Sequence, residues 1–188
     1  LSVGHNRVIV NSGIDRYEAG PARLLQRSAA AHSTIEVDGA DSSEVWSSFR
    51  VARRARPIQR ELKTDSDKVR LTCGHDGYRR LPGKVEHFRT WELSDGSLRV
   101  SDRLSGTLNT AVARFHLHPD LSAAQEEDRI TIQTSTNRIL ISIEGGTIQI
   151  VESTYHPEFG KSVPNQCLEV TLSEKTLTTE FHFGLSHR

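Results

Sequence analysis

Apolar and polar residues alternate over many short stretches of this chain, and this period of two predicts β-strands. The clearest case is residues 89–104, RTWELSDGSLRVSDRL, in which Asp95 and Gly96 separate two alternating runs. An Asp-Gly pair between such runs favours a two-residue β-turn. The hairpin places three pairs of residues opposite one another: Leu93 and Leu98, Trp91 and Val100, and Glu92 and Arg99. Two apolar pairs on one face and a charge pair on the other make this register self-consistent.

Two further segments predict hairpins of the same kind. They are residues 138–153, RILISIEGGTIQIVES, and residues 167–183, CLEVTLSEKTLTTEFHF. The expected turn residues are Gly145 and Gly146 in the first segment, and Glu174 and Lys175 in the second. These turns would place Ile143 opposite Ile148, Ile141 opposite Ile150, and Leu172 opposite Leu177. Each strand would then be apolar on one face, as a half-buried antiparallel sheet requires.

The remaining patterns favour an all-β fold. Shorter alternating runs occur in residues 33–39 and 129–135, and only residues 18–31, EAGPARLLQRSAAA, favour one or two turns of helix. Many short strands joined by tight turns indicate an antiparallel β-sandwich or barrel. Residues 7–10 resemble the return strand of a hairpin whose partner would precede Leu1. We therefore expect the chain to be a fragment that is truncated at its N-terminus.

Length and composition narrow the class of protein. The 188 residues suffice for one domain with a sizeable core. Lys plus Arg and Asp plus Glu each number 24, so the net charge of zero gives no general attraction to nucleic acid or an anionic membrane. The sequence has no bilayer-spanning apolar run and no signal-peptide pattern. Cys73 and Cys167 match no metal or redox spacing, which leaves one disulfide and two separate thiols as alternatives.

Four segments, taken in order, carry a resemblance to a known family. They are NRVIVNSG (6–13), RSAAAHSTIEVDGADSSEVWSSFRVARRARP (27–57), HDGYRRLPGKVEHFRTWEL (75–93) and RFHLHPDL (114–121). Together they resemble the C-terminal β-sandwich domain of heparinase II/III-like proteins, within the polysaccharide lyase superfamily. The resemblance continues more loosely beyond Leu121. It implies one domain over residues 1–188, a supersandwich-like antiparallel β-sandwich without the α-helical toroid domain that precedes it in the family.

The resemblance also implies a function. Family members cleave acidic, uronate-containing polysaccharides by β-elimination, in a cleft between the toroid and the sandwich. The expected substrates are heparin-like, heparan-sulfate-like or alginate-like glycans. The expected partners are therefore an acidic polysaccharide and the upstream toroid, with the isolated fragment inactive. The alternative is a non-catalytic carbohydrate-binding or scaffolding sandwich with a degenerate metal site. The sequence allows a homo-oligomer, and it allows a location in either the periplasm or the cytoplasm of a bacterium.

His32 is the first candidate for chemistry. The resemblance implies that zinc-binding members use a His-rich segment, an aspartate and the histidine equivalent to His32. The His-rich segment would precede Leu1, and Asn11 stands at the aspartate position. Asparagine is a poor zinc ligand, so the site is incomplete. We expect zinc in the full-length parent and no cofactor in the fragment. For His32 the functional interpretation is a proton-transfer group or a metal ligand. The alternative is an ordinary hydrogen-bonded residue at the start of a strand.

Tyr17 is the second candidate for catalysis. It lies in the loop between Asn11 and His32, where the resemblance implies a catalytic tyrosine in related lyases. Tyrosine and histidine commonly supply the two proton transfers of β-elimination in this family. An ordinary loop tyrosine is the alternative.

A basic run offers a candidate for binding substrate. In FRVARRARP, residues 49–57, we expect Arg50, Arg54 and Arg56 on one face of a strand and Arg53 on the other. A row of guanidinium groups suits carboxylate or sulfate, because each binds such groups with two parallel hydrogen bonds. The alternative is a solvated edge strand whose charges discourage aggregation.

A competing interpretation rests on two other histidines. His116 and His118 lie two residues apart on a predicted strand and would point to one face, as in a cupin-type metal site. Ordinary strand histidines before the turn at Pro119 are the alternative. Trp46 and Trp91 are expected in the core rather than as platforms for sugars.

Overall fold

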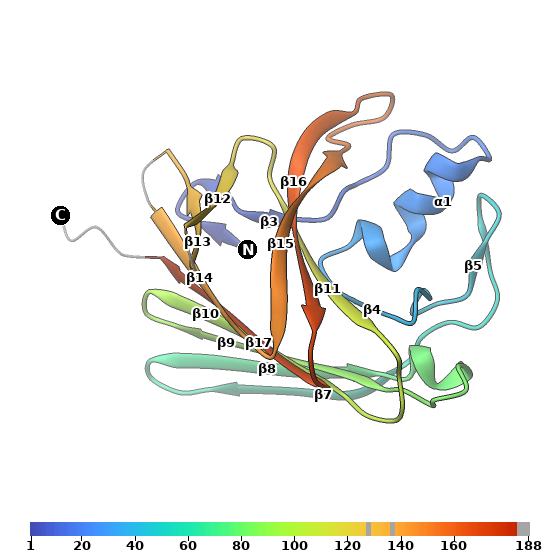
Figure 1. Ribbon diagram of the computed structural model, residues 1–188, viewed down its shortest axis with the longest axis horizontal. Helices are drawn as coiled ribbons and strands as arrows, with labels where there is room; N and C mark the ends of the chain where they lie inside the picture. The colour runs from blue at the N-terminus through green and yellow to red at the C-terminus, as the bar shows by residue number, and fades with distance from the viewer. Residues whose placement is uncertain (127–128, 136–137, 184–188) are drawn as a thin grey trace.

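The computed structural model describes residues 1–126, 129–135 and 138–183, and two antiparallel sheets enclose its core (Figure 1). Among these residues the larger sheet has eight strands in the order β12-β13-β14-β17-β10-β9-β8-β7. Their bounds are Ser122–Glu126 (β12), Arg129–Gln133 (β13), Arg138–Glu144 (β14), Thr176–Phe183 (β17), Ser97–Leu104 (β10), His87–Ser94 (β9), Lys68–His75 (β8) and Pro57–Thr64 (β7). The all-β sandwich expected from the sequence is therefore confirmed.

The smaller sheet packs across the larger one in the order β15-β16-β11-β3, and β4 also pairs with β11. Its bounds are Gly146–Tyr155 (β15), Val163–Leu172 (β16), Ala111–Leu117 (β11), Ile9–Val10 (β3) and Ile35–Val37 (β4). The short strands β3 and β4 lie one after the other along the same edge of β11. This arrangement brings the chain near Asn11 and the chain near Ser33 together.

The remaining elements are short. Two small hairpins are formed by Ser2–Val3 (β1) with Asn6–Arg7 (β2), and by Val45–Trp46 (β5) with Arg50–Val51 (β6). The helical segments are Pro21–Arg27 (α1), Ala29–Ala31 (η1) and Gly77–Arg80 (η2). Helix α1 packs beside β5 at one end of the sandwich (Figure 1). The short helix expected in residues 18–31 is confirmed as α1. No helix in the described part of the chain is long and apolar enough to span a membrane.

The first predicted hairpin is confirmed in the register that the sequence indicates. Strands β9 and β10 pair Leu93 with Leu98, and Glu92 with Arg99. The alternation also continues into the core, because Val100 and Leu104 are almost fully buried. The same alternation buries Asp102 on this face, so one apolar stripe carries a charge.

The other two predicted hairpins are wrong. Strand β14 pairs with β17 in the larger sheet, whereas β15 pairs with β16 in the smaller sheet. The chain therefore crosses between sheets at Gly145, and it crosses back between Leu172 and Thr176. The two connections lie side by side, since the Ser173 N–H donates to the Gly145 carbonyl at 2.9 Å. Alternation correctly predicted which residues face the core, but it did not predict the sheet to which each strand belongs.

The hairpin expected at the N-terminus, with a partner strand before Leu1, is also wrong. Residues 7–10 do not form one return strand, because β2 ends at Arg7 and β3 begins at Ile9. The partner of β2 is β1, within the chain, and Val10 pairs with His116 on β11. The local turn at Gly4, with φ of 58°, closes this small hairpin.

The core fills the space between the sheets. Phe115 from the smaller sheet and Phe181 from the larger sheet meet edge to face, with ring centroids 5.4 Å apart. Tyr78 is fully buried, and its hydroxyl donates to the Ile35 carbonyl at 2.6 Å. Trp91 packs against this core as expected, whereas Trp46 is 47% exposed and the expectation that it is buried was wrong.

Candidate functional site

Ser33, just before β4, links this part of the chain to the end of β3 at the centre of the candidate site. Its hydroxyl donates to the Val10 carbonyl at 2.6 Å and accepts from the His116 N–H at 3.1 Å. Its own N–H donates to Oδ1 of Asn11 at 2.9 Å, and its carbonyl accepts from Nη1 of Arg89 at 2.7 Å. Asn11 therefore has a structural role, because its amide oxygen closes the gap between β3 and β4.

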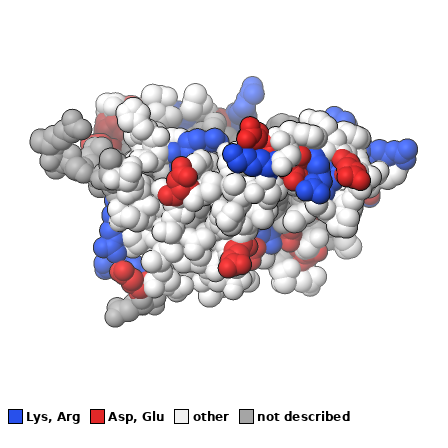
Figure 2. Space-filling view, turned by 90° about the horizontal axis from the view of Figure 1, so that it is seen from above, with Lys and Arg blue, Asp and Glu red and all other residues white. Residues whose placement is uncertain are grey.

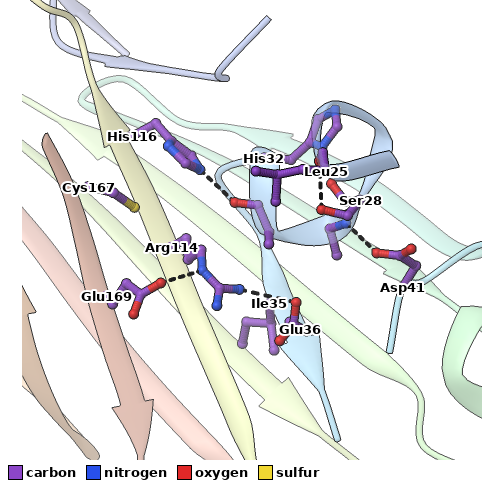
Figure 3. A network of polar contacts seen from close by, with 12 residues as sticks. Leu25, Ser28, His32, Ile35, Glu36, Asp41, Arg114, His116, Cys167 and Glu169 are labelled. Carbon is purple, nitrogen blue, oxygen red and sulfur yellow. Dashed lines mark hydrogen bonds and ion pairs between the residues drawn. The ribbon is translucent and has the colours of Figure 1, made fainter. Parts of the chain in front are cut away.

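The ring of His32 is held in one orientation. Its Nδ1 lies 2.8 Å from the Ser28 carbonyl (Figure 3). A carbonyl only accepts, so Nδ1 carries the proton and the neutral ring has its lone pair on Nε2. No partner for Nε2 occurs among the described residues. A backbone carbonyl on one ring nitrogen and an available lone pair on the other is the arrangement of both a general base and a metal-ligating histidine.

His116 and His118 have different partners and do not form a common site. Nε2 of His116 donates to the Ala30 carbonyl at 2.9 Å (Figure 3). Nδ1 of His116 lies 3.4 Å from the Ser153 hydroxyl. Burial is the main reason why the pKa of His116 is lowered. His118 lies beyond the end of β11 and instead contacts the Tyr155 ring. The cupin-like interpretation therefore lacks its geometry here.

Among the residues that the structure describes, the donor set for zinc is incomplete. Within the described residues, no group of three or more His, Cys, Asp or Glu side chains could hold a metal ion. His32 offers one nitrogen, and the oxygen of Asn11 already accepts from Ser33. Zinc prefers four ligands from imidazole, thiolate or carboxylate. The residues described here do not fit a zinc site by themselves.

Two further side-chain groups surround this region. Arg114 lies between two carboxylates, 2.6 Å from Glu169 and 3.4 Å from Glu36 (Figure 3). Cys167 is buried nearby, and burial raises the pKa of its thiol to about 12, so the thiol stays protonated and unreactive. Cys73 is also a free thiol, which decides against the disulfide.

A buried charge network lies beneath Ser33. Asp102 is fully buried and accepts two hydrogen bonds from Arg89, at 2.6 and 3.0 Å. It also accepts from Nε2 of His87 at 2.6 Å. Sequence reasoning missed this network, although the confirmed β9–β10 register, extended by two pairs, places Arg89 opposite Asp102.

The network extends through a second histidine. Nδ1 of His75 accepts from the Gly77 N–H at 3.2 Å, so its Nε2 carries the proton and donates to Nδ1 of His87 at 3.2 Å. Burial and the neighbouring His87 lower the pKa of His75 to about 4. The ring is thus neutral at physiological pH and supports the orientation of His87.

The low pKa of His75 predicts a pH dependence of stability. Its pKa in the unfolded chain is about 6.5, so the unfolded state binds the proton first. The contribution of neutral His75 to the free energy of unfolding is complete above pH ~6.5 and is lost as the pH falls towards ~4. Over this range the free energy of unfolding should fall by up to about 1.4 kcal/mol per pH unit. Urea unfolding between these pH values should show this slope and should show a shallower one for His75→Gln. Equal slopes would contradict the assignment.

A pocket opens between the sheets next to Ser33. Its lining includes Asn11, Arg7 and Arg89 among the polar residues, and Trp91 and Phe115 among the apolar ones. Its volume is about 420 Å³. The pocket shows that Asn11 and Ser33 lie at an accessible edge of the sandwich rather than deep in its core.

Tyr17 belongs to a different cluster. Tyr17 is 52% exposed, and its ring lies 5.8 Å from the Phe49 ring and 5.2 Å from the Phe159 ring, centroid to centroid. The Arg23 guanidinium lies 5.3 Å from the Tyr17 centroid. Among the described residues no hydrogen bond or ring contact joins Tyr17 to His32. The two catalytic candidates are therefore not in direct contact through these interactions.

The predicted row of arginines on one strand face is wrong. Strand β6 ends at Val51, so Arg54 and Arg56 lie outside it. Arg50 covers the ring of Trp46, with its guanidinium carbon 4.7 Å from the centroid. Beyond the strand, the Glu44 N–H donates to the Arg53 carbonyl at 2.8 Å, and the Glu44 carboxylate pairs with the Arg53 side chain at 2.7 Å. Arg54 and Arg56 are exposed residues of the connection to β7.

Charges of both signs are mixed on the surface. On the face shown in Figure 2, lysine and arginine side chains lie among aspartates and glutamates, with broad uncharged areas between them. Recognition of an acidic polymer on this face would therefore depend on individual arginines rather than on a continuous basic patch.

Comparisons with known proteins place these features in context. A family model described as "Heparinase II/III-like, C-terminal" matches residues 1–183. The solved heparan sulfate lyase HepC from Pedobacter heparinus has a TM-score of 0.78 and 15% identity, over 100% of this chain and 30% of that protein. A heparinase III, the BT4657 gene product, has a TM-score of 0.70 and 12% identity, over 94% and 28%. A comparison with curated proteins gave no match. This chain spans about 30% of the length of the solved HepC lyase.

Proposed function

Because this chain belongs to the heparinase II/III-like family as its C-terminal domain, we propose that it forms one wall of the cleft of a polysaccharide lyase. The expected substrate is an acidic, uronate-containing polysaccharide, and the other wall is a toroid domain of the same polypeptide. The observation that carries the proposal is the family match over residues 1–183, together with the available Nε2 of His32. The longer protein, rather than this chain alone, carries the activity.

The proposed reaction is β-elimination. A base removes the proton on the carbon next to the uronate carboxylate, the bond to the glycosidic oxygen breaks, and an acid protonates that oxygen. The products are a sugar with a new carbon–carbon double bond and a sugar with a free hydroxyl. Nε2 of His32 has the lone pair that a base requires, and Ser28 holds the ring in place.

The other residues have proposed roles of different kinds. Tyr17 is proposed as a second proton-transfer group, and its exposure leaves its hydroxyl accessible to a substrate. Arg50, Arg54 and Arg56 are proposed as separate contacts for carboxylate or sulfate groups, since they do not form a row. A zinc ion in the longer protein would take Nε2 of His32 as a ligand and need most other ligands from outside this chain.

Replacing His32 tests the proposal. In the full-length protein, His32→Ala should lower kcat by about 100-fold or more, because proton transfer by a positioned side chain contributes at least that factor. The measurement is the ultraviolet absorbance of the unsaturated uronate product, with several acidic polysaccharides as substrates. His182→Ala is the matched control, because His182 is 46% exposed on the other sheet and should leave kcat unchanged.

A non-catalytic binding domain is the second candidate. The observation that favours it is the structural use of Asn11, whose oxygen supports Ser33 instead of a metal. A full-length protein that binds acidic polysaccharides, but forms no unsaturated product from any of them, would support this candidate and contradict the lyase.

A further inference from the structure

We propose that Arg23 and the exposed aromatic rings around it bind an anionic substituent, carboxylate or sulfate, on a sugar ring. This inference rests on the proposed function, because it takes the acidic polysaccharide as the ligand and adds a binding site for it. The carrying observation is a largely buried guanidinium that has no counterion in the described part of the chain and lies beneath an open aromatic surface. This site shares Tyr17 with the proposed proton-transfer groups, and it uses neither His32 and Asn11 nor the side chains of Arg50, Arg54 and Arg56.

Arg23 is a largely buried cation with no polar partner among the residues that the structure describes. The residue is only 7% exposed, and its Nε is buried without a hydrogen-bond partner. Within the described part of the chain, no ion pair and no hydrogen bond involves its guanidinium. Its closest neighbours are two rings instead: the guanidinium carbon lies 5.3 Å from the Tyr17 centroid and 5.7 Å from the Phe49 centroid. Cation–π contacts stabilise it only in part.

A buried, unpaired charge is costly and therefore informative. Arginine side chains are almost never buried unless they are paired, because removal from water without a partner destabilises the fold. Asp15, an acidic residue in the same loop as Tyr17, already accepts from Arg16 and from Gln26. Arg23 thus keeps its donors for a group that is outside the described chain. Arginine binds planar or tetrahedral oxyanions with two parallel hydrogen bonds.

The aromatic side chains around Arg23 are unusually exposed. Phe49 is 67% exposed, Phe159 is 64% exposed and Tyr17 is 52% exposed. Contiguous exposed apolar surface commonly marks a binding site. Flat rings offer an apolar face to the C–H side of a sugar ring, while the cation beneath takes its charged substituent. Exposed side chains change rotamer rapidly, so Tyr17 and Phe49 can open access to the guanidinium.

The three aromatic residues come from separate segments that the fold fixes in place. Arg27, one turn after Arg23 on α1, donates to the Ser47 carbonyl at 2.6 Å and to the Arg50 carbonyl at 3.3 Å. These bonds hold the turn that carries Phe49 against the helix. The loop that carries Phe159 is attached by the Gly160 N–H, which donates to the Asp15 carbonyl at 2.8 Å. The site is therefore largely pre-formed, which favours binding.

The test measures binding of defined oligosaccharides to the chain by calorimetry. The ligands are an unsulfated uronate oligosaccharide, its sulfated counterpart and a neutral oligosaccharide of equal length. Arg23→Met keeps the length of the side chain and removes the charge, and Arg23→Lys keeps the charge and removes the fork. Arg103→Met is the matched control, since Arg103 also lies over a ring, 4.2 Å from the Phe88 centroid, but is exposed on the larger sheet.

We expect Arg23→Met to weaken binding of at least one acidic ligand tenfold or more, Arg23→Lys to weaken it less, and Arg103→Met to leave it unchanged. Loss with both acidic ligands identifies the carboxylate, and loss with the sulfated one alone identifies sulfate. The Tm of Arg23→Met should stay equal or rise, because an unpaired buried charge is removed. A purely structural arginine would lower Tm without changing the affinity of the folded protein.

Two outcomes would overturn the inference: Arg23→Met binds as the parent chain does, or no acidic oligosaccharide binds the parent chain more tightly than the neutral one. A protein partner on the aromatic surface would give this second result. Turnover separates this failure from failure of the proposed function. A full-length Arg23→Met lyase with unchanged kcat and KM would overturn the inference and leave the lyase assignment intact.

Discussion

Asp102→Ala should lower the free energy of unfolding by about 3–5 kcal/mol. The substitution removes the carboxylate that Arg89 and His87 contact, and it leaves the Arg89 guanidinium buried without a counterion. Burial opposes ionisation of Asp102, but Arg89 and His87 outweigh it and hold its pKa below the usual value. Urea unfolding followed by circular dichroism at neutral pH measures the change.

The Arg99–Glu180 pair provides the control for this experiment. It also joins neighbouring strands of the larger sheet, at 3.0 Å, but Arg99 is 51% exposed. Arg99→Ala should cost less than about 1 kcal/mol, because water and salt screen exposed pairs. Similar losses for Asp102→Ala and Arg99→Ala would contradict the view that burial makes this network important.

Gly145→Ala should destabilise the fold by roughly 2–5 kcal/mol. Gly145 has φ of 95°, which L residues rarely adopt, and a Cβ there would lie within 2.3 Å of the Thr176 carbonyl oxygen. That oxygen is a backbone atom of the first residue of β17, where the second connection between the sheets ends, so the clash cannot be relieved by a side-chain rotation. Thermal and urea unfolding should both show the loss.

Gly160→Ala separates the two causes of this loss, which are backbone strain at a positive φ and the clash of the new Cβ. Gly160 also has a positive φ, 77°, but a Cβ there meets nothing within 4 Å. Its replacement should cost only about 1 kcal/mol, from backbone strain. If the two substitutions cost the same, the close packing of the two connections would not explain the requirement for glycine at Gly145.

The candidate site was only partly predictable from the sequence. His32 and Asn11 were identified through the resemblance, and the hydrogen bonds now show what each does: Ser28 orients His32, and Asn11 supports Ser33. Arg23 gave no signal in the sequence, because an arginine in a short helical segment is usually solvated. Its isolation becomes visible only when three separate segments meet around it.

Local pattern determined the strands, the core-facing residues and the β9–β10 register, because alternation and an Asp-Gly turn act over neighbouring residues. The sequence also carried, through four ordered segments, the family to which the chain belongs. Only the tertiary structure decided that the chain changes sheets at Gly145, and only it brought Asp102, Arg89 and His87 into one network with His75. The physical reason is that an apolar stripe specifies burial but not the partner across the core. Sheet membership and charge pairing depend on contacts between residues far apart in the chain.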